Sequence, residues 1–264
     1  FDSNLVNTDL KPDNFDTLSS NINFNLENEK FSFETGFTAY EDLSKSNSDR
    51  FQYVLPYYDF SKSFFNNNLA SFDFNSQGDN ILKDTNSLRS RMINNLNVQS
   101  IDYFSKNGFK NNLNYYLKNT INAGKNNSEY DSSPQIKFMN IFEVVSSFPL
   151  IKKDESFINY LNPKLSLRMN PSDMKDYSNQ NRQINTENIF NINRLGLNDT
   201  LESGENLTLG LDYKKEKIDN INKYFELSLG KIIRTKSNNN IPSNSTIDKK
   251  NSNYFGKLEN NLNE

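Results

Sequence analysis

Apolar and polar residues alternate along most of this chain of 264 residues. The segment 206–213 is the clearest case, because Leu207, Leu209 and Leu211 are separated by polar residues or glycine. Strict alternation of this kind predicts a β-strand with one apolar face. The pattern leaves open what that face contacts, either a protein core or lipid.

Alternating runs recur about a dozen times, and no segment shows persuasive helical periodicity. Asn28 and Glu29 predict a tight turn between the first two strands, and Pro56 predicts the end of the third. The predicted strands lie at 22–26, 31–37, 51–55, 69–74, 88–98, 109–121, 136–144, 161–169, twice within 188–216, at 225–229 and from 254 onward.

The length of these runs favours a membrane. Most extend over about 9–14 residues, as a tilted strand needs to cross a bilayer, whereas ordinary strands average about 5–6. Three segments, 122–134, 171–187 and 235–252, are rich in Asn, Ser, Asp and Lys, and we expect them to be long loops with little that could pack. Short turns at one end and long loops at the other are typical of an outer-membrane barrel.

The composition points the same way. Only 34% of the residues are hydrophobic and the mean hydropathy is −0.82, which is too little for a thick core. Aromatic residues nevertheless make up 13% of the chain, which argues against disorder. We therefore predict an all-β fold, an antiparallel transmembrane β-barrel with lipid outside and water inside. A soluble extracellular β-sheet protein, with its apolar face buried against a second sheet, is the alternative.

Composition also excludes several functions. The net charge of −3 is spread over interspersed acidic and basic residues, which argues against binding to nucleic acid. The chain has no His and no Cys, so it can build neither a Ser-His-Asp triad nor a disulfide. It has no Gly-rich phosphate loop, and we predict neither a cofactor nor an enzymatic activity.

One segment imitates a calcium-binding loop. Asp73, Gly78 and Asp84 fall at the first, sixth and twelfth places of such a loop. The remaining ligand positions and the strand-like flanks fit calcium poorly, so we predict a polar hairpin tip and no metal site.

The segment 188–216, NIFNINRLGLNDTLESGENLTLGLDYKKE, carries a more specific pattern. In it a strand ends in an Asn-Arg-Leu-Gly sequence, a Glu/Gly turn follows, and a second alternating strand begins. This pattern resembles the C-terminal barrel domain of the LptD family, the outer-membrane proteins that assemble lipopolysaccharide. Segments 50–64, 148–167 and 224–234 resemble neighbouring strands of the same domain. The matching motif residues are Asn193, Arg194, Leu195, Gly196, Asp199, Glu202, Gly204, Gly210 and Tyr213.

The motif residues are expected to have structural roles. Gly204 suits a tight turn, and Gly210 suits a bend or a close approach within a strand. Arg194 on the polar face needs a carboxylate partner, and Asp199 and Glu202 are near it in the sequence.

The resemblance implies a translocon component in the outer membrane of a Gram-negative bacterium, which inserts lipopolysaccharide into the outer leaflet. Its implied partners are lipopolysaccharide, an outer-membrane lipoprotein plug, the periplasmic lipopolysaccharide-bridge proteins and the lipid bilayer. A passive porin-like channel is the alternative within the membrane.

Both chain ends suggest an internal fragment. The chain opens with Phe1, and residues 261–264 still read as a strand. We expect 1–264 to be a single partial barrel domain that lacks the first and last barrel strands and the N-terminal periplasmic domain.

Overall fold

A computed structural model describes residues 16–66 and 69–262. These residues form one antiparallel sheet of thirteen strands in the order β1-β2-β3-β4-β5-β7-β8-β10-β11-β12-β13, with β6 paired to β7 and β9 to β10. The strands are β1 (Thr17–Glu27), β2 (Phe31–Asp42), β3 (Phe51–Asn66), β4 (Ala70–Lys83), β5 (Ser87–Ser100), β6 (Tyr103–Phe104), β7 (Lys110–Lys125), β8 (Gln135–Ser147), β9 (Leu150–Lys153), β10 (Phe157–Asn170), β11 (Gly204–Lys217), β12 (Tyr224–Arg234) and β13 (Phe255–Asn260).

The only helical turns in the described ranges are two 3-10 turns, η1 (Ser48–Arg50) and η2 (Ser243–Ser245). In the same ranges, no helix is long and apolar enough to cross a membrane. The prediction of an all-β, antiparallel fold is confirmed.

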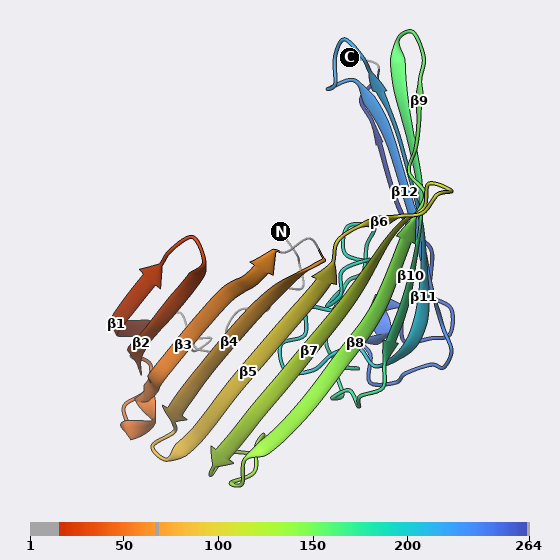
Figure 1. Cartoon of the computed structure of the whole chain (residues 1–264). Coiled ribbons are helices and arrows are strands. Elements are labelled where there is room, and N and C mark those ends of the chain that lie inside the picture. The colour runs from red at the N-terminus through yellow and green to blue at the C-terminus, as the bar shows by residue number, and fades with distance from the viewer. Residues whose placement is uncertain (1–15, 67–68, 263–264) are drawn as a thin grey trace. The chain divides into compact units, whose positions relative to one another are not determined.

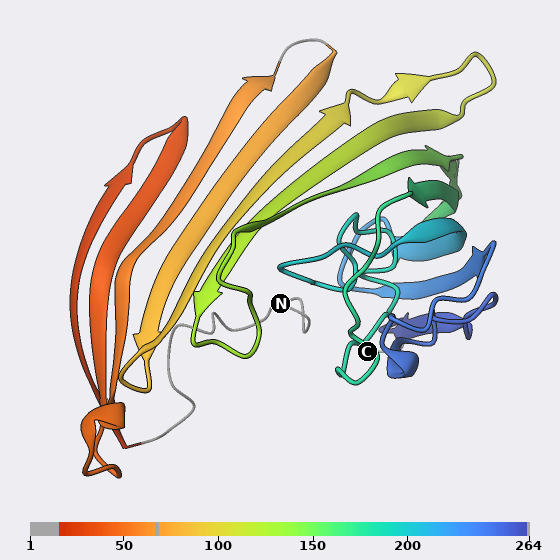
Figure 2. The same cartoon turned by 90° about the horizontal axis from the view of Figure 1, so that it is seen from below.

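The described residues divide into two compact units. The N-terminal unit comprises 16–98 and 117–139, and the C-terminal unit comprises 99–116 and 140–262. Long strands lie side by side in the N-terminal unit from β1 to β4 (Figure 1). In the C-terminal unit, coil from 171–203 lies against the strands β11 and β12 (Figure 2).

The opening hairpin has the predicted faces. Ile22 pairs with Phe37 and Leu26 with Phe33, so the apolar side chains of β1 and β2 share one face. This apolar face is exposed, with Ile22 at 76%. The C-terminal unit exposes Leu167 on β10 in the same way. The soluble alternative needed a second sheet to cover such a face, whereas the strands between residues 16 and 262 belong to one sheet.

The predicted end of a strand at Pro56 is wrong, because β3 continues to Asn66. In the pairing of β3 with β4, Val54 and Tyr57 are successive paired residues, and those between them have no partner on β4. The register of β3 with β2 shifts at the same place. Pro56 therefore lies in a bulge, where the N–H that proline lacks is not needed for the ladder.

The predicted hairpin tip at 73–84 is also wrong. Residues 73–83 belong to β4, and the turn to β5 occupies only 84–86. Asp79 lies inside this strand and accepts hydrogen bonds from Arg89 and Arg91. Its carboxylate therefore serves cross-strand pairing within the sheet.

Two further expectations fail in the C-terminal unit. The first strand predicted within 188–216 is a series of turns from 186 to 195, and only β11 is formed. The supposedly unpacked loops contribute a hydrophobic cluster with Ile232 of β12. Its other buried members are Met174, Ile184, Ile189, Leu195, Leu197, Ile241 and Ile247. Apolar residues spaced irregularly in Asn-rich sequence gave no periodic signal, although folding brings them together.

The last predicted strand is shorter than expected. Strand β13 ends at Asn260, Asn261 and Leu262 lie outside it, and 263–264 lie beyond the described residues.

A row of hydrogen-bonded polar side chains crosses the face of the N-terminal unit that carries most of its apolar side chains. The Tyr58 and Ser76 hydroxyls are 3.1 Å apart, and Ser76 Oγ donates to Asn94 Oδ1 at 2.7 Å. Asn94 Nδ2 donates to Asn119 Oδ1 at 3.0 Å, and Asn119 Nδ2 donates to the Lys137 carbonyl oxygen at 3.1 Å. The row lies near the middle of β3, β4, β5 and β7, and each hydrogen bond offsets part of the cost of removing these groups from water.

We expect Asn94→Leu to destabilise the protein by about 1–3 kcal/mol, because Ser76 and Asn119 each lose a partner. Thermal unfolding of the protein in detergent micelles, followed by circular dichroism, measures the change. Met92→Leu, two residues away on the same face, is the control and should leave the transition temperature nearly unchanged. An Asn94→Leu protein as stable as the control would show that the row contributes no stability.

Candidate functional site

Two long loops cover the polar face of three strands in the C-terminal unit. The loops 171–203 and 235–254 follow β10 and β12, which run in the same direction, so both loops leave from the same end of the strands. The β11–β12 connection at the other end spans only 218–223. Between the loops and the strands lies a buried charge cluster, formed by Glu143, Arg168, Arg194, Glu202 and Arg234.

Glu202 is the centre of this charge cluster. Arg194 binds its carboxylate in a bidentate manner, with Nε 2.7 Å from Oε2 and Nη2 2.6 Å from Oε1. Arg234 Nη1 donates to Oε1, and Arg168 Nη1 lies 3.7 Å from Oε2. One loop carboxylate thus contacts a guanidinium from its own loop and one from each of β10 and β12.

Strand residues complete the surroundings of Arg194. Its Nη1 donates to Thr208 Oγ1 at 3.0 Å, and its Nη2 donates to Asn206 Oδ1 at 3.1 Å. Asn206 also donates to Glu202, at 3.3 Å. Arg194 is 1% exposed, so a loop arginine is fully enclosed between its own loop and the polar face of β11.

Arg168 joins Glu202 to a second carboxylate. Its Nη2 donates to Glu143 Oε1 at 2.8 Å and to the Asn191 carbonyl oxygen at 2.9 Å. Glu143 also accepts from Ser166 at 2.7 Å and from Asn114 at 3.0 Å. The charge cluster therefore ties the loop to β7, β8, β10, β11 and β12.

Electrostatics keep the central pair ionised. Burial alone would raise the pKa of Glu202, but the guanidiniums of Arg194, Arg234 and Arg168 outweigh it and hold that pKa well below its usual range. Burial lowers the pKa of Arg194 from its ordinary value, while the attraction of Glu202 opposes the change. A guanidinium remains charged under either influence.

The motif residues beside the charge cluster shape its loop. Asn193 accepts a hydrogen bond from the Leu197 backbone N–H at 3.2 Å and donates to the Leu197 carbonyl oxygen at 3.0 Å. Gly196 has a φ of +61° and Gly204 a φ of +89°, which favour glycine. The carboxylate that pairs with Arg194 is that of Glu202. Asp199 instead accepts hydrogen bonds from Lys175 Nζ at 2.9 Å and from the Tyr177 hydroxyl.

Of the three remaining motif residues, Leu195 belongs to the hydrophobic cluster, and Gly210 and Tyr213 lie on β11. A Cβ on Gly210 would come within 2.6 Å of the Phe190 ring, so Gly210 permits the close approach expected for it. The Tyr213 hydroxyl donates to Asn159 on β10 at 2.9 Å. Sequence reasoning missed Glu143, Arg168 and Arg234. Their one sequence signal is a charged side chain at a polar-face position of an alternating strand.

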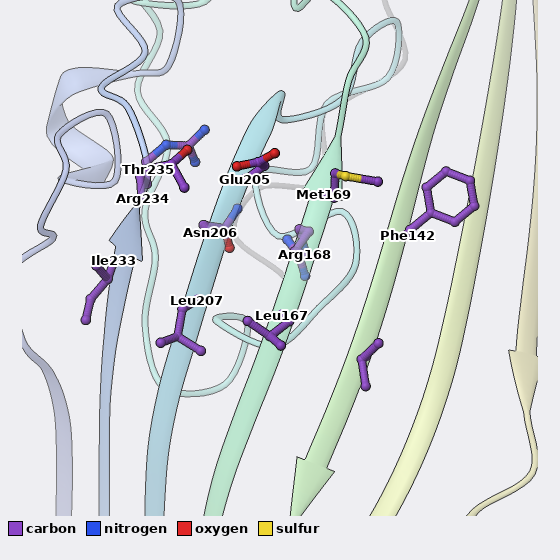
Figure 3. A pocket seen from close by; sticks show the side chains of 11 residues that line it. Phe142, Leu167, Arg168, Met169, Glu205, Asn206, Leu207, Ile233, Arg234 and Thr235 are labelled. Carbon is purple, nitrogen blue, oxygen red and sulfur yellow. The ribbon is translucent and has the colours of Figure 1, made fainter.

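The opposite face of the same strands carries an apolar groove of about 600 Å³. Leu167, Leu207 and Ile233 form a row across β10, β11 and β12, alternating with Arg168, Asn206 and Arg234 (Figure 3). Phe142, Val144 and Met169 extend the groove, and Glu205 and Thr235 lie at its polar edge. Each strand thus has one face for apolar surroundings and one for buried charge.

The charge cluster is suited to a structural role. No group of three His, Cys, Asp or Glu residues that could hold a metal ion lies within 16–66 or 69–262. The charge cluster has its acids and bases engaged with one another, without a free nucleophile beside a base.

The sequence comparison identifies the family. Residues 4–264 match the LptD family, described as LPS transport system D. This chain belongs to the LptD family. The sequence matches no individual curated protein. Membership accounts for the two faces of the strands, because LptD proteins transport lipopolysaccharide at the Gram-negative outer membrane and their barrel strands face lipid on one side.

We expect Glu202→Gln to destabilise this LptD-family chain by about 3–5 kcal/mol, because three buried guanidiniums lose their shared countercharge. Heat-induced unfolding in detergent micelles provides the measurement. Glu205→Gln removes an exposed carboxylate three residues away and should change stability by less than about 0.5 kcal/mol. Equal effects of the two substitutions would contradict a central role for Glu202.

The charge cluster also predicts sensitivity to acid. Because the folded state lowers the pKa of Glu202, the ionised carboxylate stabilises the fold fully above about pH 5. This stabilisation is lost as the pH falls through the lowered pKa of Glu202. The difference in unfolding temperature between the wild type and Glu202→Gln should therefore shrink from pH 7 to pH 3. A difference that stays constant over this range would show that Glu202 ionisation does not stabilise the fold.

Proposed function

We propose that this chain forms part of the wall of an outer-membrane translocon that inserts lipopolysaccharide into the outer leaflet. One observation carries the proposal. The strands of this LptD-family sheet have an exposed apolar face, and on their opposite, polar face a loop is fixed by buried ion pairs. Lipopolysaccharide has the same division, with acyl chains and a polar saccharide. The sheet suits a molecule whose two parts must travel in different surroundings.

In this proposal the saccharide travels along the hydrated polar face while the acyl chains pass into lipid at a seam of the barrel. The energy comes from elsewhere in the transport pathway. The proposed partners are a lipoprotein plug inside the barrel and the periplasmic bridge proteins that deliver lipopolysaccharide. Among residues 16–66 and 69–262, the edge strands β1 and β13 each have one hydrogen-bonded neighbour, which supports a place within a larger single barrel.

Eight of the nine motif residues have a positioning role in this proposal, and the ninth, Leu195, belongs to the hydrophobic cluster. Arg194 and Glu202 fix the 171–203 loop to the polar face, and Gly196 and Gly204 allow its turns. The remaining four support the loop or the strands beside it, namely Asn193, Asp199, Gly210 and Tyr213. Because the loop is fixed in place, the space that it leaves open on the polar face has a constant size and shape.

Site-specific photo-crosslinking in cells tests the proposal. The full-length protein carries a photoreactive amino acid either at Glu226, on the polar face of β12, or at Leu229, on its exposed apolar face. We expect the Glu226 position to capture the saccharide of lipopolysaccharide while transport proceeds. The Leu229 position should capture acyl chains.

Depletion of the protein supplies the second readout. A translocon role predicts that lipopolysaccharide accumulates in inner compartments and that a lipoprotein co-purifies with the barrel. A barrel that purifies alone, conducts ions steadily and gives no lipopolysaccharide adduct at Glu226 would instead be a porin-like channel.

A further inference from the structure

The apolar face of β10 and β11 ends at a definite row of residues. Leu167 and Leu207 form its last wholly apolar pair, and the three pairs before them on the same face are also apolar or aromatic. The next outward pair is Met169 with Glu205, and the Thr235 backbone N–H donates to the Glu205 carbonyl oxygen at 3.2 Å. The apolar pairs cover about 20 Å of strand, close to the band of about 25 Å that faces hydrocarbon in a membrane barrel. Glu205 and Thr235 therefore mark the edge of the lipid-facing band.

The apolar groove lies on the hydrocarbon side of this edge (Figure 3). Its volume of about 600 Å³ falls within the range of about 300–1,000 Å³ that is typical of ligand cavities. Several of its lining side chains carry only hydrocarbon, namely Phe142, Val144, Leu167, Leu207 and Ile233. Such a groove takes a hydrocarbon chain, because a polar group placed in it would lose its hydrogen bonds.

A second cavity, of about 690 Å³, lies on the other side of the edge, and we call it the head pocket. It is lined largely by the loops 171–203 and 235–254, where they join the ends of β10, β11 and β12. The apolar groove and the head pocket are continuous, because some strand-end residues line both. These shared residues are Met169, Glu205, Arg234 and Thr235. A molecule that occupies both cavities must be apolar at one end and polar at the other.

The walls of the head pocket are fixed by hydrogen bonds between the two loops. Asn238 Nδ2 donates to Ser203 Oγ at 2.8 Å, and Asn240 Nδ2 donates to the Met174 carbonyl oxygen at 3.1 Å. All four residues line the pocket. The pocket is therefore formed by contacts within the chain, which reduces the ordering that binding requires.

Three exposed charged groups in the head pocket select the ligand. Asp173, Glu205 and Lys236 line the pocket, and within the described part of the chain none of them is in an ion pair. Arg234 also lines it, but its guanidinium is engaged by Glu202. Two free carboxylates and one free ammonium are complementary to a headgroup that carries an ammonium beside a phosphate. A headgroup with negative charge alone would meet net repulsion.

We propose that the apolar groove and the head pocket together bind one molecule of a phospholipid with an ammonium headgroup, phosphatidylethanolamine, from the surrounding membrane. One acyl chain lies in the groove, the ammonium lies between Asp173 and Glu205, and the phosphate lies beside Lys236. This inference goes beyond the proposed function, because the ligand is a resident lipid of the bilayer and not the transported cargo. It depends on the membrane setting of the family alone.

Native mass spectrometry of the full-length protein tests the site. The protein is released from micelles that contain equal amounts of phosphatidylethanolamine and phosphatidylglycerol with identical acyl chains, so that any difference in retention reports the headgroup. We expect phosphatidylethanolamine to be retained about fivefold more than phosphatidylglycerol. Equal retention of the two lipids would overturn the proposal, and so would displacement of phosphatidylethanolamine by an equal amount of lipopolysaccharide.

A probe without acyl chains tests the role of the apolar groove. Glycerophosphoethanolamine has the same headgroup and no hydrocarbon chain. A large excess of it should leave the retained phosphatidylethanolamine in place, because the groove contributes affinity only to a chain. Displacement by this probe would show that the groove does not take part in binding.

Matched variants locate the lipid on the chain. Glu205→Gln should reduce the preference for phosphatidylethanolamine about threefold or more, because the ammonium loses one of its two carboxylates. Glu155→Gln, at an exposed carboxylate in the β9–β10 turn, should leave the preference unchanged. Glu205 makes no ion pair within the described residues, so its replacement leaves the buried charge cluster intact. An unchanged preference in Glu205→Gln would refute the site.

The outcome is separable from that of the crosslinking experiment. Crosslinking of lipopolysaccharide at Glu226 reports transport along the polar face, whereas lipid retention reports the opposite, apolar face. A lost headgroup preference beside intact crosslinking would refute the lipid site alone. An intact preference without crosslinking would refute the translocon role alone.

Discussion

The enclosure of Glu202 by three guanidiniums is the constraint on which the C-terminal unit depends. Glu202 and Arg194 come from one loop, and Arg168 and Arg234 come from two strands, so the carboxylate fixes the loop against the sheet. Removing the charge of Glu202 leaves three buried guanidiniums with Glu143 as the remaining carboxylate of the cluster, which is costly in a low-dielectric interior. The hydrophobic cluster around Ile189, Leu195 and Ile232 adds burial to this electrostatic contact. Ion pairs and apolar contacts together therefore fix an Asn-rich loop to the strands beneath it.

The same strands meet a different requirement on their other face. Leu167, Leu207 and Ile233 are presented outward, one residue away in sequence from Arg168, Asn206 and Arg234. Alternation lets one backbone satisfy lipid and buried charge simultaneously, which explains how a chain with few apolar residues forms a large sheet. The N-terminal unit departs from this division at the row from Tyr58 to Asn119. There the polar groups are satisfied by one another, so the row can lie within an apolar surface.

The charged side chains of the two units have different structural roles. In the C-terminal unit the buried arginines and carboxylates fix a loop against the polar face of the strands. In the N-terminal unit, Arg89 and Arg91 of β5 pair with Asp79 of β4, so their charges link neighbouring strands.

The sequence by itself determined the strands, their two faces and the family, because alternation is a local property that survives whatever the strands later contact. It also offered Asp199 or Glu202 as the partner of Arg194 and predicted a bend or close approach at Gly210. It did not determine that 188–196 forms turns, that Pro56 lies in a bulge, or that the polar loops contain a hydrophobic cluster. Nor could it find Glu143, Arg168 and Arg234 as partners of the motif. These depend on contacts between segments far apart in the chain. Only the tertiary structure brings such segments together, since the pairing of strands and the burial of charge are decided by the free energy of the whole fold.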